Sequence, residues 1–421
     1  MVTLGAEVKP ESDTKVNKDQ RSSVRESGLR ALYVLGPGDI VKMYRELLDG
    51  IESSVQMHQD FSKLFLDWCD ESGTKAHLVS WHSRSEVLKD GPYLLENRPK
   101  PPLYYRRGLL HHIGQFMYGL GIVATAVRER ANVVIADSGS AHWIVLSLLP
   151  LFGIPVIAVM HNSLWAAGFR PKRSPHRQLL SLDGFFFRHS AAATVCVSPE
   201  CERQVRDLAG TPKGPVYQCR AQYRLGFLDN VKPVPPHSLR PFRVMFLGRI
   251  EAFKGVFMIL SMAEQLEKEF PGQFAWKIVG GGPALEPLRK EAKERKLSQV
   301  EITGRVSNAQ LIEALGWAHI LVAPTTSGFC EGLAMTAAEG VLAGRPVVVS
   351  TVVPAWEVLG DAAIVAQAED VDSFVRTFRR LLLEPDYYEH CQRATTGAQA
   401  QFYHAPEGLG AVLGRAILAL R

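Results

Sequence analysis

The chain alternates short, mainly apolar segments with longer amphipathic ones, and this alternation constrains its fold more than any other feature. In the first half, the apolar segments that predict strands are residues 30–35, 75–81, 133–136, 155–160 and 193–197. The amphipathic segments that predict helices are residues 40–51, 109–128 and 140–149. Strands that are apolar throughout are typical of a parallel sheet covered by helices on both faces. The pattern therefore predicts an α/β fold.

A proline-rich segment, residues 231–241, interrupts this alternation. Strand segments then resume at residues 242–247, 275–279, 300–303, 320–323 and 346–350, with helical segments between them. We therefore predict two doubly wound, Rossmann-like domains, residues 28–230 and 242–395, which face each other across a cleft. The polar residues 1–27 are predicted to form a disordered tail. Residues 396–421 are predicted to carry a C-terminal helix, for which packing on the N-terminal domain is one option.

Composition excludes several classes of protein. Hydrophobic residues make up 46% of the 421 residues and charged residues 22%, which argues against general disorder. The 48 Lys and Arg exceed the 43 Asp and Glu by too little to indicate a nucleic-acid-binding protein. The six cysteines show no CxxC spacing, and no apolar run approaches the roughly 20 residues that span a bilayer. We therefore expect a cytoplasmic protein without nucleic-acid partners, and the inner face of the membrane stays open as a location.

Two cations follow the first strand of the second half. Arg249 and Lys254 lie five residues apart on a glycine-flanked loop, where both can reach one diphosphate. Two solvated surface cations are the simpler interpretation of the pair taken alone. The next strand leads into a glycine run, residues 280–282, but a dinucleotide-binding fingerprint fails because Leu285 stands at its last glycine position. This failure argues against a dehydrogenase.

Two carboxylates, Glu331 and Glu339, lie eight residues apart around the start of a helix predicted near Leu333. Eight residues is a little over two helical turns, so this placement predicts both carboxylates on roughly one face. Free backbone amides at a helix N-terminus suit a phosphate group. One carboxylate could then bind sugar hydroxyls and the other a ribose. The pair is explained equally well by an acid near the helix N-terminus, where the helix dipole favours it, followed by an exposed acid in the middle of the helix.

Four motifs in order give the second half a family resemblance. Gly-Arg-x4-Lys, Gly-Gly-Gly-Pro, Thr-Gly-Arg-Val and Glu-x7-Glu each follow a predicted strand. From about residue 242 to residue 368, the chain resembles the donor-binding domain of the GT-B glycosyltransferases, specifically the retaining glycosyltransferase family 4, or group 1. This resemblance implies two Rossmann-like domains and the transfer of a sugar from a nucleotide-diphosphate sugar.

The resemblance also implies roles for the charged residues. Arg249 and Lys254 are similar to the pair that neutralises the donor diphosphate. Glu331 is similar to the carboxylate near the transferred sugar, and His161, at the end of a strand in the first half, to the histidine that contacts that sugar. Glu339 is similar to the carboxylate that holds the ribose hydroxyls. A structural hydrogen bond is the alternative role for His161.

Backbone positions of the family are matched as well. The stretch of Gly304, Arg305 and Val306 resembles the one that borders the nucleobase. Leu333 and Ala334 occupy the family's phosphate-contacting turn, although this sequence lacks the usual Phe-Gly there, and Ala334 restricts the backbone. Gly36 and Gly38 resemble the flexible glycine loop that faces donor and acceptor.

The expected activity is retaining transfer of a hexosyl group to a hydroxyl acceptor of unknown identity, with a UDP-sugar favoured as donor. No cofactor or metal is expected, because the single Asp-x-Asp string, residues 370–372, is interpreted as a loop or helix cap. A glycoside phosphorylase, a nucleotide-sugar epimerase and a non-catalytic nucleotide-binding scaffold remain alternatives. Two basic, aromatic-rich stretches, residues 98–107 and 170–188, permit peripheral membrane contact. We favour solvated loops beside a core helix for them.

Overall fold

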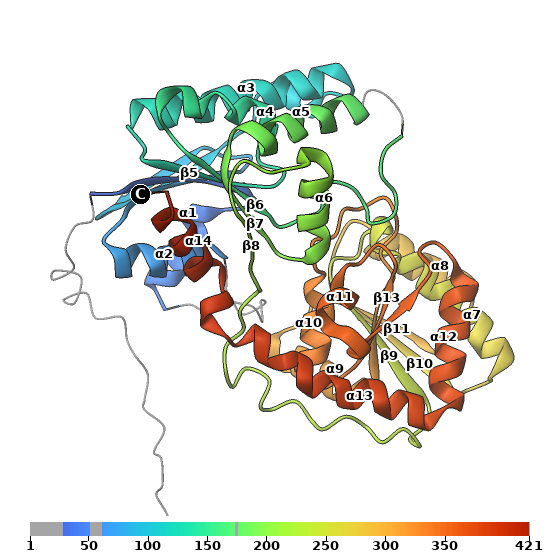
Figure 1. The fold of residues 1–421 in the computed structure, drawn as a ribbon. Coiled ribbons are helices and arrows are strands. Elements are labelled where there is room, and N and C mark those ends of the chain that lie inside the picture. The colour runs from blue at the N-terminus through green and yellow to red at the C-terminus, as the bar shows by residue number, and fades with distance from the viewer. Residues whose placement is uncertain (1–27, 51–60, 173–175, 421) are drawn as a thin grey trace, which may run out of the picture.

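The computed structural model describes residues 28–50, 61–172 and 176–420. The predicted tail, residues 1–27, lies outside these ranges. The described residues form two α/β halves, each built on its own sheet, and Figure 1 shows them one above the other. The fold class predicted from the alternation of strands and helices is confirmed.

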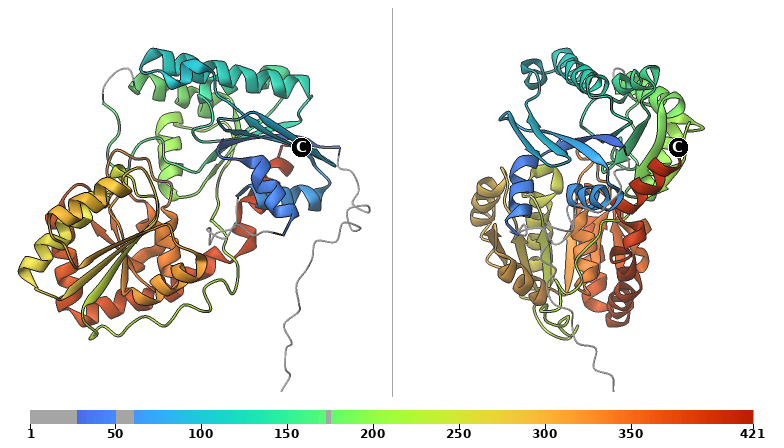
Figure 2. Two further views of the ribbon diagram at one scale, coloured as in Figure 1. Left: turned by 180° about the vertical axis from the view of Figure 1, so that it is seen from behind. Right: turned by 90° about the vertical axis from the view of Figure 1, so that its left-hand side faces the viewer.

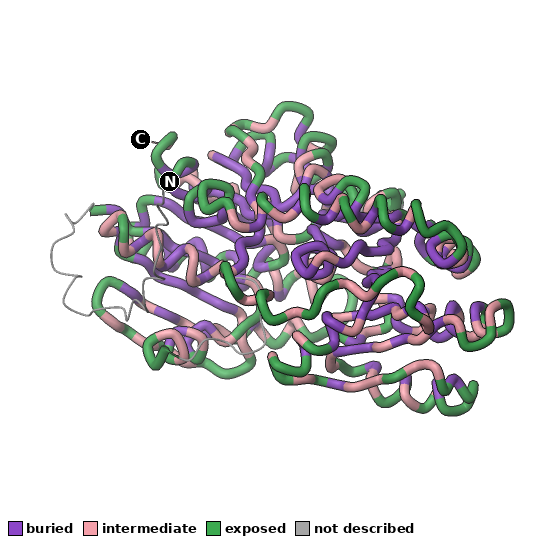
Figure 3. The backbone as a smooth tube through the Cα atoms, turned by 90° about the horizontal axis from the view of Figure 1, so that it is seen from below, coloured by how far each residue is buried: buried purple, intermediate pink, exposed green. Residues whose placement is uncertain are grey.

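The N-terminal sheet has eight strands in the order β3-β4-β2-β1-β5-β6-β7-β8. All neighbours are parallel except β3 and β4, which pair as an antiparallel hairpin. The strand bounds are β1 Arg30–Pro37, β2 Lys75–Trp81, β3 Glu86–Asp90, β4 Tyr93–Arg98, β5 Val133–Asp137, β6 Val156–Met160, β7 Ala191–Cys196 and β8 Val216–Gln218. The central strands β5 and β6 are buried along their whole length, as expected for a sheet covered on both faces. Figure 3 shows buried backbone in the interior of the molecule and exposed backbone mainly at its margins.

Helices cover both faces of this sheet (Figures 1 and 2). On one face lie α3 Leu109–Arg128, α4 Trp143–Leu146 and α5 His176–His189, followed along the chain by α6 Pro199–Ala209. On the other face lie α1 Ile40–Leu48, α2 Phe61–Ser72 and the C-terminal helix α14 Leu409–Leu418. Helix α14 belongs to the N-terminal core, because five of its apolar residues are buried there: Leu409, Val412, Leu413, Ala416 and Ile417.

The C-terminal sheet has six parallel strands in the order β11-β10-β9-β12-β13-β14. Their bounds are β9 Phe242–Leu247, β10 Phe274–Val279, β11 Val300–Gly304, β12 Ile320–Ala323, β13 Val347–Ser350 and β14 Ala363–Ala366. The helices are α7 Val256–Glu269, α8 Leu285–Glu294, α9 Asn308–Trp317, α10 Met335–Leu342, α11 Ala355–Leu359, α12 Val371–Leu383 and α13 Pro385–Gln399. Helices α7, α8 and α12 share one apolar core, while α9, α10 and α11 share another.

The structure differs from the sequence-based expectation at several places; helix α2 and strand β8, for example, were not predicted. The helix expected at residues 140–149 shrinks to α4, because the Ser140 hydroxyl donates to the Asp137 carbonyl (2.7 Å) and holds a turn before it. The hairpin β3–β4 was not predicted, since β3 is a half-exposed edge strand with a polar pattern. Helix α13 was not predicted either, and it runs across the boundary expected at residue 395.

Candidate active site

A cavity of about 330 Å³ lies between the two halves, and both contribute to its wall. The C-terminal half supplies the loops after β9 and β12 and the start of α10, and the N-terminal half supplies the ends of β6 and β7. Carboxyl ends of parallel strands are where open α/β sheets bind ligands. The cavity therefore occupies the position where the sequence predicted a cleft.

A buried ion pair forms part of the cavity wall. Lys254, at the end of a 3₁₀ turn after β9, places its Nζ 2.5 Å from Oε1 of Glu331. The Thr325 hydroxyl donates to the same carboxylate oxygen (2.8 Å). The Lys254 ammonium also lies 4.3 Å from the ring centroid of Phe329, a favourable cation–π distance. Lys254 and Glu331, 77 residues apart in sequence, thus meet at one point with their charges compensated.

Arg249 lines the same cavity, but it does not share the environment of Lys254. Its guanidinium is largely solvent-exposed and lies 3.0 Å from the Glu251 carboxylate. The cavity therefore has one buried cation, already paired, and one exposed cation that can swing toward a ligand at little cost.

Glu331 and Glu339 are not related by a helical face, and the expectation that they share one is wrong. Helix α10 begins at Met335, so Glu331 lies in the preceding loop and only Glu339 is helical. Residues 331–336 line the cavity and Glu339 does not. The helix start is fixed to β9 because the Thr336 hydroxyl donates to the Leu247 carbonyl (2.6 Å). The first amides of α10 have no acceptor within the helix and lie at the cavity edge.

Glu339 is nearly inaccessible, and burial raises the pKa of its carboxyl group to about 7. No described residue donates a hydrogen bond to this carboxylate. Ionising this carboxyl group therefore lowers the free energy of unfolding, and no partner among the described residues offsets the loss.

Glu339→Gln is expected to stabilise the protein at alkaline pH. The cost of the raised pKa is absent below the ordinary value of 4.5, grows as the pH rises toward 7, and is complete above it. The free energy of unfolding of the variant should exceed that of the wild type by about 2–3 kcal/mol at alkaline pH, and by little under acid conditions. Urea unfolding at both pH values measures this. The same change at exposed Glu294 is the control, and a pH-independent difference for Glu339→Gln would contradict the burial argument.

Ala334 adopts φ +67°, a conformation that glycine takes freely and alanine does not. Alanine in place of the usual glycine was expected to restrict the backbone, and the structure has a strained backbone at this residue, directly before α10. Because the residue lines the cavity, the strained peptide belongs to the ligand-facing wall.

Ala334→Gly is expected to raise the free energy of unfolding by about 1 kcal/mol, because it removes this strain. Denaturant titration measures the change. Ala124→Gly, within helix α3, should lower stability by roughly 0.5–1 kcal/mol. If both substitutions destabilised the protein alike, Ala334 would not be strained.

The stretch of Gly304, Arg305 and Val306 lies outside this cavity lining, at the end of β11. Arg305 is exposed, and its side chain occupies the space beside Gly281, where an added Cβ would lie 2.7 Å from its Cγ. The glycine run at 280–282 serves packing: a Cβ at Gly280 would lie 1.8 Å from the Gly248 carbonyl oxygen. The close approach of these loops explains the glycines without a dinucleotide.

The N-terminal half contributes a second cavity of about 440 Å³. Gly36 and Gly38 line it, and it shares Phe61 and His161 with the first cavity, so the two adjoin. His161 is held by Asp137, whose Oδ1 lies 3.0 Å from Nε2 and also accepts from the Tyr33 hydroxyl (2.9 Å). The other ring nitrogen, Nδ1, is buried and has no hydrogen-bond partner among the described residues.

The sequence analysis did not identify Asp137 as a site residue, although a carboxylate at the end of a buried strand can indicate one. The strand was expected to end at residue 136, which placed Asp137 in a turn. In the structure it is the last residue of β5 and is 6% exposed. Its partner is therefore the histidine that follows the neighbouring strand β6.

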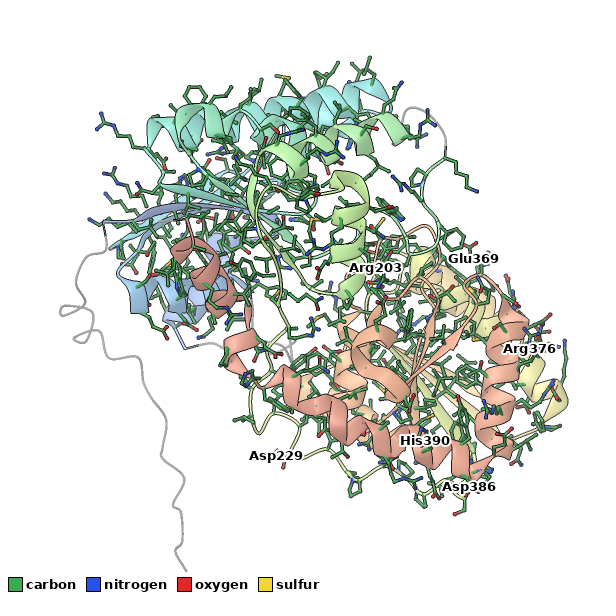
Figure 4. The ribbon with its side chains drawn as sticks, viewed as in Figure 1. Arg203, Asp229, Glu369, Arg376, Asp386 and His390 are labelled. Carbon is green, nitrogen blue, oxygen red and sulfur yellow. The ribbon has the colours of Figure 1, made fainter. Side chains whose placement is uncertain are left out.

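The two halves touch closely beside the cavity. A Cβ at Gly332 would lie 1.8 Å from the His161 carbonyl oxygen, so only glycine fits there. Farther out, Arg203 on α6 pairs with Glu357 on α11 and with Glu200, and these carboxylates hold the pKa of Arg203 well above its ordinary value. Figure 4 places Arg203 where α6 approaches the C-terminal half. These contacts set the distance between the walls of the cleft.

The described residues contain no group of three or more His, Cys, Asp or Glu arranged to hold a metal ion. Asp370, from the Asp-x-Asp string, caps α12 by accepting from the Ser373 amide (2.9 Å). Among the helices described, none is long and apolar enough to cross a bilayer.

Family models match both halves. A model for glycosyl transferases group 1 matches residues 229–399, and one for glycosyltransferase family 4 matches residues 68–218. The glycogen synthase of Mycobacterium tuberculosis is 23% identical over 277 residues, which are 63% of this chain and 63% of that protein. An uncharacterized glycosyltransferase of Methanocaldococcus jannaschii is 26% identical over 117 residues, 28% of this chain and 31% of that protein. The alignments thus span less than two thirds of these relatives.

Solved structures share the whole fold. The sucrose-phosphate synthase of Thermosynechococcus elongatus superposes with a TM-score of 0.67 over 93% of this chain and 98% of its own, at 15% identity. HepE of Anabaena, solved in complex with UDP, gives a TM-score of 0.62 over 93% and 99%, at 13% identity. At such low identity the likeness shows the fold, which is GT-B.

Proposed function

Since the chain belongs to the group 1 glycosyltransferases of the GT-B fold, we propose that it transfers a sugar from a nucleotide-diphosphate sugar to a hydroxyl acceptor with retention at the anomeric carbon. The observation that carries the proposal is the Lys254–Glu331 pair in the wall of a cavity lined by both halves. UDP is the favoured nucleotide, because solved proteins of this fold include a UDP complex and UDP-forming synthases.

The charges of the cavity suit a departing diphosphate. Lys254, Arg249 and the first residues of α10 all line the cavity. Fixed cations and amide dipoles stabilise charge that develops on a leaving group without reorganising during the reaction. Glu339 lies beyond this wall, and a ribose hydroxyl that donates to it would satisfy its unpartnered carboxylate.

Retention is proposed to occur by attack on the same face that the diphosphate leaves. Glu331 is a carboxylate that lines the cavity, but Lys254 and Thr325 both donate to its Oε1, so we assign it the role of a positioning anion and not of a nucleophile. The bond from the anomeric carbon to the phosphate oxygen breaks as the acceptor oxygen bonds to that carbon. The acceptor proton passes to the departing phosphate oxygen, and His161, held by Asp137, orients the sugar.

Nucleoside-diphosphate release tests the proposal. The protein is incubated with UDP-, GDP-, ADP- and dTDP-sugars, with and without a panel of hydroxyl acceptors. Release that depends on an acceptor is expected, with an unchanged anomeric configuration by NMR. Sugar 1-phosphate formed from a glycoside and inorganic phosphate would indicate a phosphorylase, and conversion of the nucleotide sugar without release would indicate an epimerase. Binding of the nucleotide sugar without any conversion would indicate a non-catalytic nucleotide-binding scaffold.

A further inference from the structure

The solvent-facing side of helix α3 is apolar along its length. Every exposed residue from position 109 to position 127 is a hydrophobic residue or glycine: Leu109, Leu110, Ile113, Phe116, Met117, Leu120, Gly121, Ala124 and Val127. The opposite side packs on the core through residues such as Tyr118 and Ile122. A helix in the outer layer of a protein normally exposes a polar face to solvent. A helix that is apolar on all sides normally packs its outer side against another protein or a membrane.

The apolar surface continues onto neighbouring elements. Leu151 and Phe152, in the 3₁₀ turn before β6, are 78% and 57% exposed. Leu182 and Phe185, on α5, are also exposed. Helices α3, α4 and α5 form one layer at the end of the molecule far from the C-terminal half, in all three views of the ribbon (Figures 1 and 2). We call this surface, made by the exposed residues of α3, the 3₁₀ turn and α5, the α3 face.

The segments that build the α3 face carry a single acid, Asp183 on α5. No Asp or Glu occurs from residue 97 to residue 128, or from residue 138 to residue 182. Exposed cations stand at its margins: Arg106 and Arg107 precede α3, and Arg177 and Arg188 lie on α5. The acid on α5, Asp183, is half-buried, and burial raises its pKa to about 7, which weakens its charge at neutral pH. An apolar strip bordered by cations is complementary to a surface with an apolar interior and anionic headgroups.

We propose that the α3 face docks in the plane of an anionic lipid bilayer. Helix α3 lies along the headgroup boundary with Leu109, Phe116 and Leu120 inserted, and the arginines at its margins contact lipid phosphates. A second copy of the chain or another protein would pair as well with the apolar strip, but it would not require the scarcity of acids around it. This docking is independent of the proposed transfer reaction. Solvated loops beside a core helix, the interpretation favoured above for residues 98–107 and 170–188, do not account for the exposed apolar side of α3.

Vesicle co-sedimentation of the full chain tests the docking. Vesicles of phosphatidylcholine containing about one-third phosphatidylglycerol should bind the protein at least tenfold more strongly than pure phosphatidylcholine, and high salt should weaken the binding. Leu109→Glu combined with Phe116→Glu should lower the partition coefficient at least tenfold, and so should Arg106→Glu combined with Arg107→Glu. All four side chains are exposed, so the variants are expected to fold.

Matched controls lie on the C-terminal half. Leu383→Glu replaces a leucine whose exposure lies between those of Leu109 and Phe116, and Lys290→Glu with Lys293→Glu makes the same charge change on α8. Both should bind vesicles like the wild type. Equal binding to both vesicle types, or no effect of the α3 substitutions, would overturn the proposal. So would a dimer without vesicles, by light scattering, that Leu109→Glu dissociates, because the face would then belong to a second copy.

Discussion

Lys254→Ala is expected to lower kcat/KM by about 10²–10³-fold, measured as nucleoside diphosphate released from the donor that the screen identifies. Among the described residues of the cavity wall, Lys254 is a largely buried cation, whereas Arg249 is mostly exposed and its charge is screened more strongly by solvent. A desolvated charge acts on a developing diphosphate with little dielectric screening. Calorimetry should also show weaker binding of UDP.

The loss in Lys254→Ala has a second possible origin, since Glu331 would become an unpaired buried carboxylate. Glu331→Gln separates the two effects, because the neutral amide keeps the size of the side chain and can still accept from Thr325. It should lower kcat strongly while leaving UDP binding within a few-fold of the wild type. Lys268→Ala removes an exposed, paired lysine on α7 and should change neither quantity. Full activity of either cavity variant would remove the pair from the mechanism.

Much of the fold follows from local pattern. The segments predicted at 75–81 and 242–247 are strands with those bounds, because the interior of a covered parallel sheet needs mainly apolar strands. The hairpin β3–β4 and helix α13 were not predicted from the sequence, since each of them buries only one side. Helix α13 buries Tyr388, Cys391, Thr395 and Ala398 at helical spacing, but its other residues are mostly polar.

The site is predictable only in part, because sequence places residues at strand ends without fixing their partners. The loops after β9 and β12 were expected to converge, and Lys254 and Glu331 lie in them. Arg249 pairs with Glu251, two residues away. The sequence motif was defined by Arg249 and Lys254 and did not include this acid. Helical spacing does not relate Glu331 to Glu339, since Glu331 lies in the loop before α10. The pairing of Asp137 with His161 depends on the order of strands in the sheet.

Gly332→Ala is expected to lower kcat by about 10²-fold, because it forces the two halves apart at the cavity. The added Cβ would lie 1.8 Å from the His161 carbonyl oxygen and 2.9 Å from a methyl carbon of Val197, both on the N-terminal half. Neither neighbour is the end of a flexible side chain, so the clash is relieved by moving one half against the other. Such a shift would carry His161 away from Lys254 and Glu331, and reacting groups displaced by about 1 Å lose most of their alignment.

Binding and turnover should respond differently to Gly332→Ala. The proposed diphosphate contacts all lie on the C-terminal half, so the affinity for UDP should change only a few-fold while kcat falls. Gly328→Ala is the control in the same loop: its Cβ would lie 3.5 Å from the nearest atom, an ordinary contact, and it should behave like the wild type. Unchanged turnover in Gly332→Ala would mean that the reaction tolerates a wider cleft. Equal losses in both variants would mean that the loop matters for another reason than the distance between the halves.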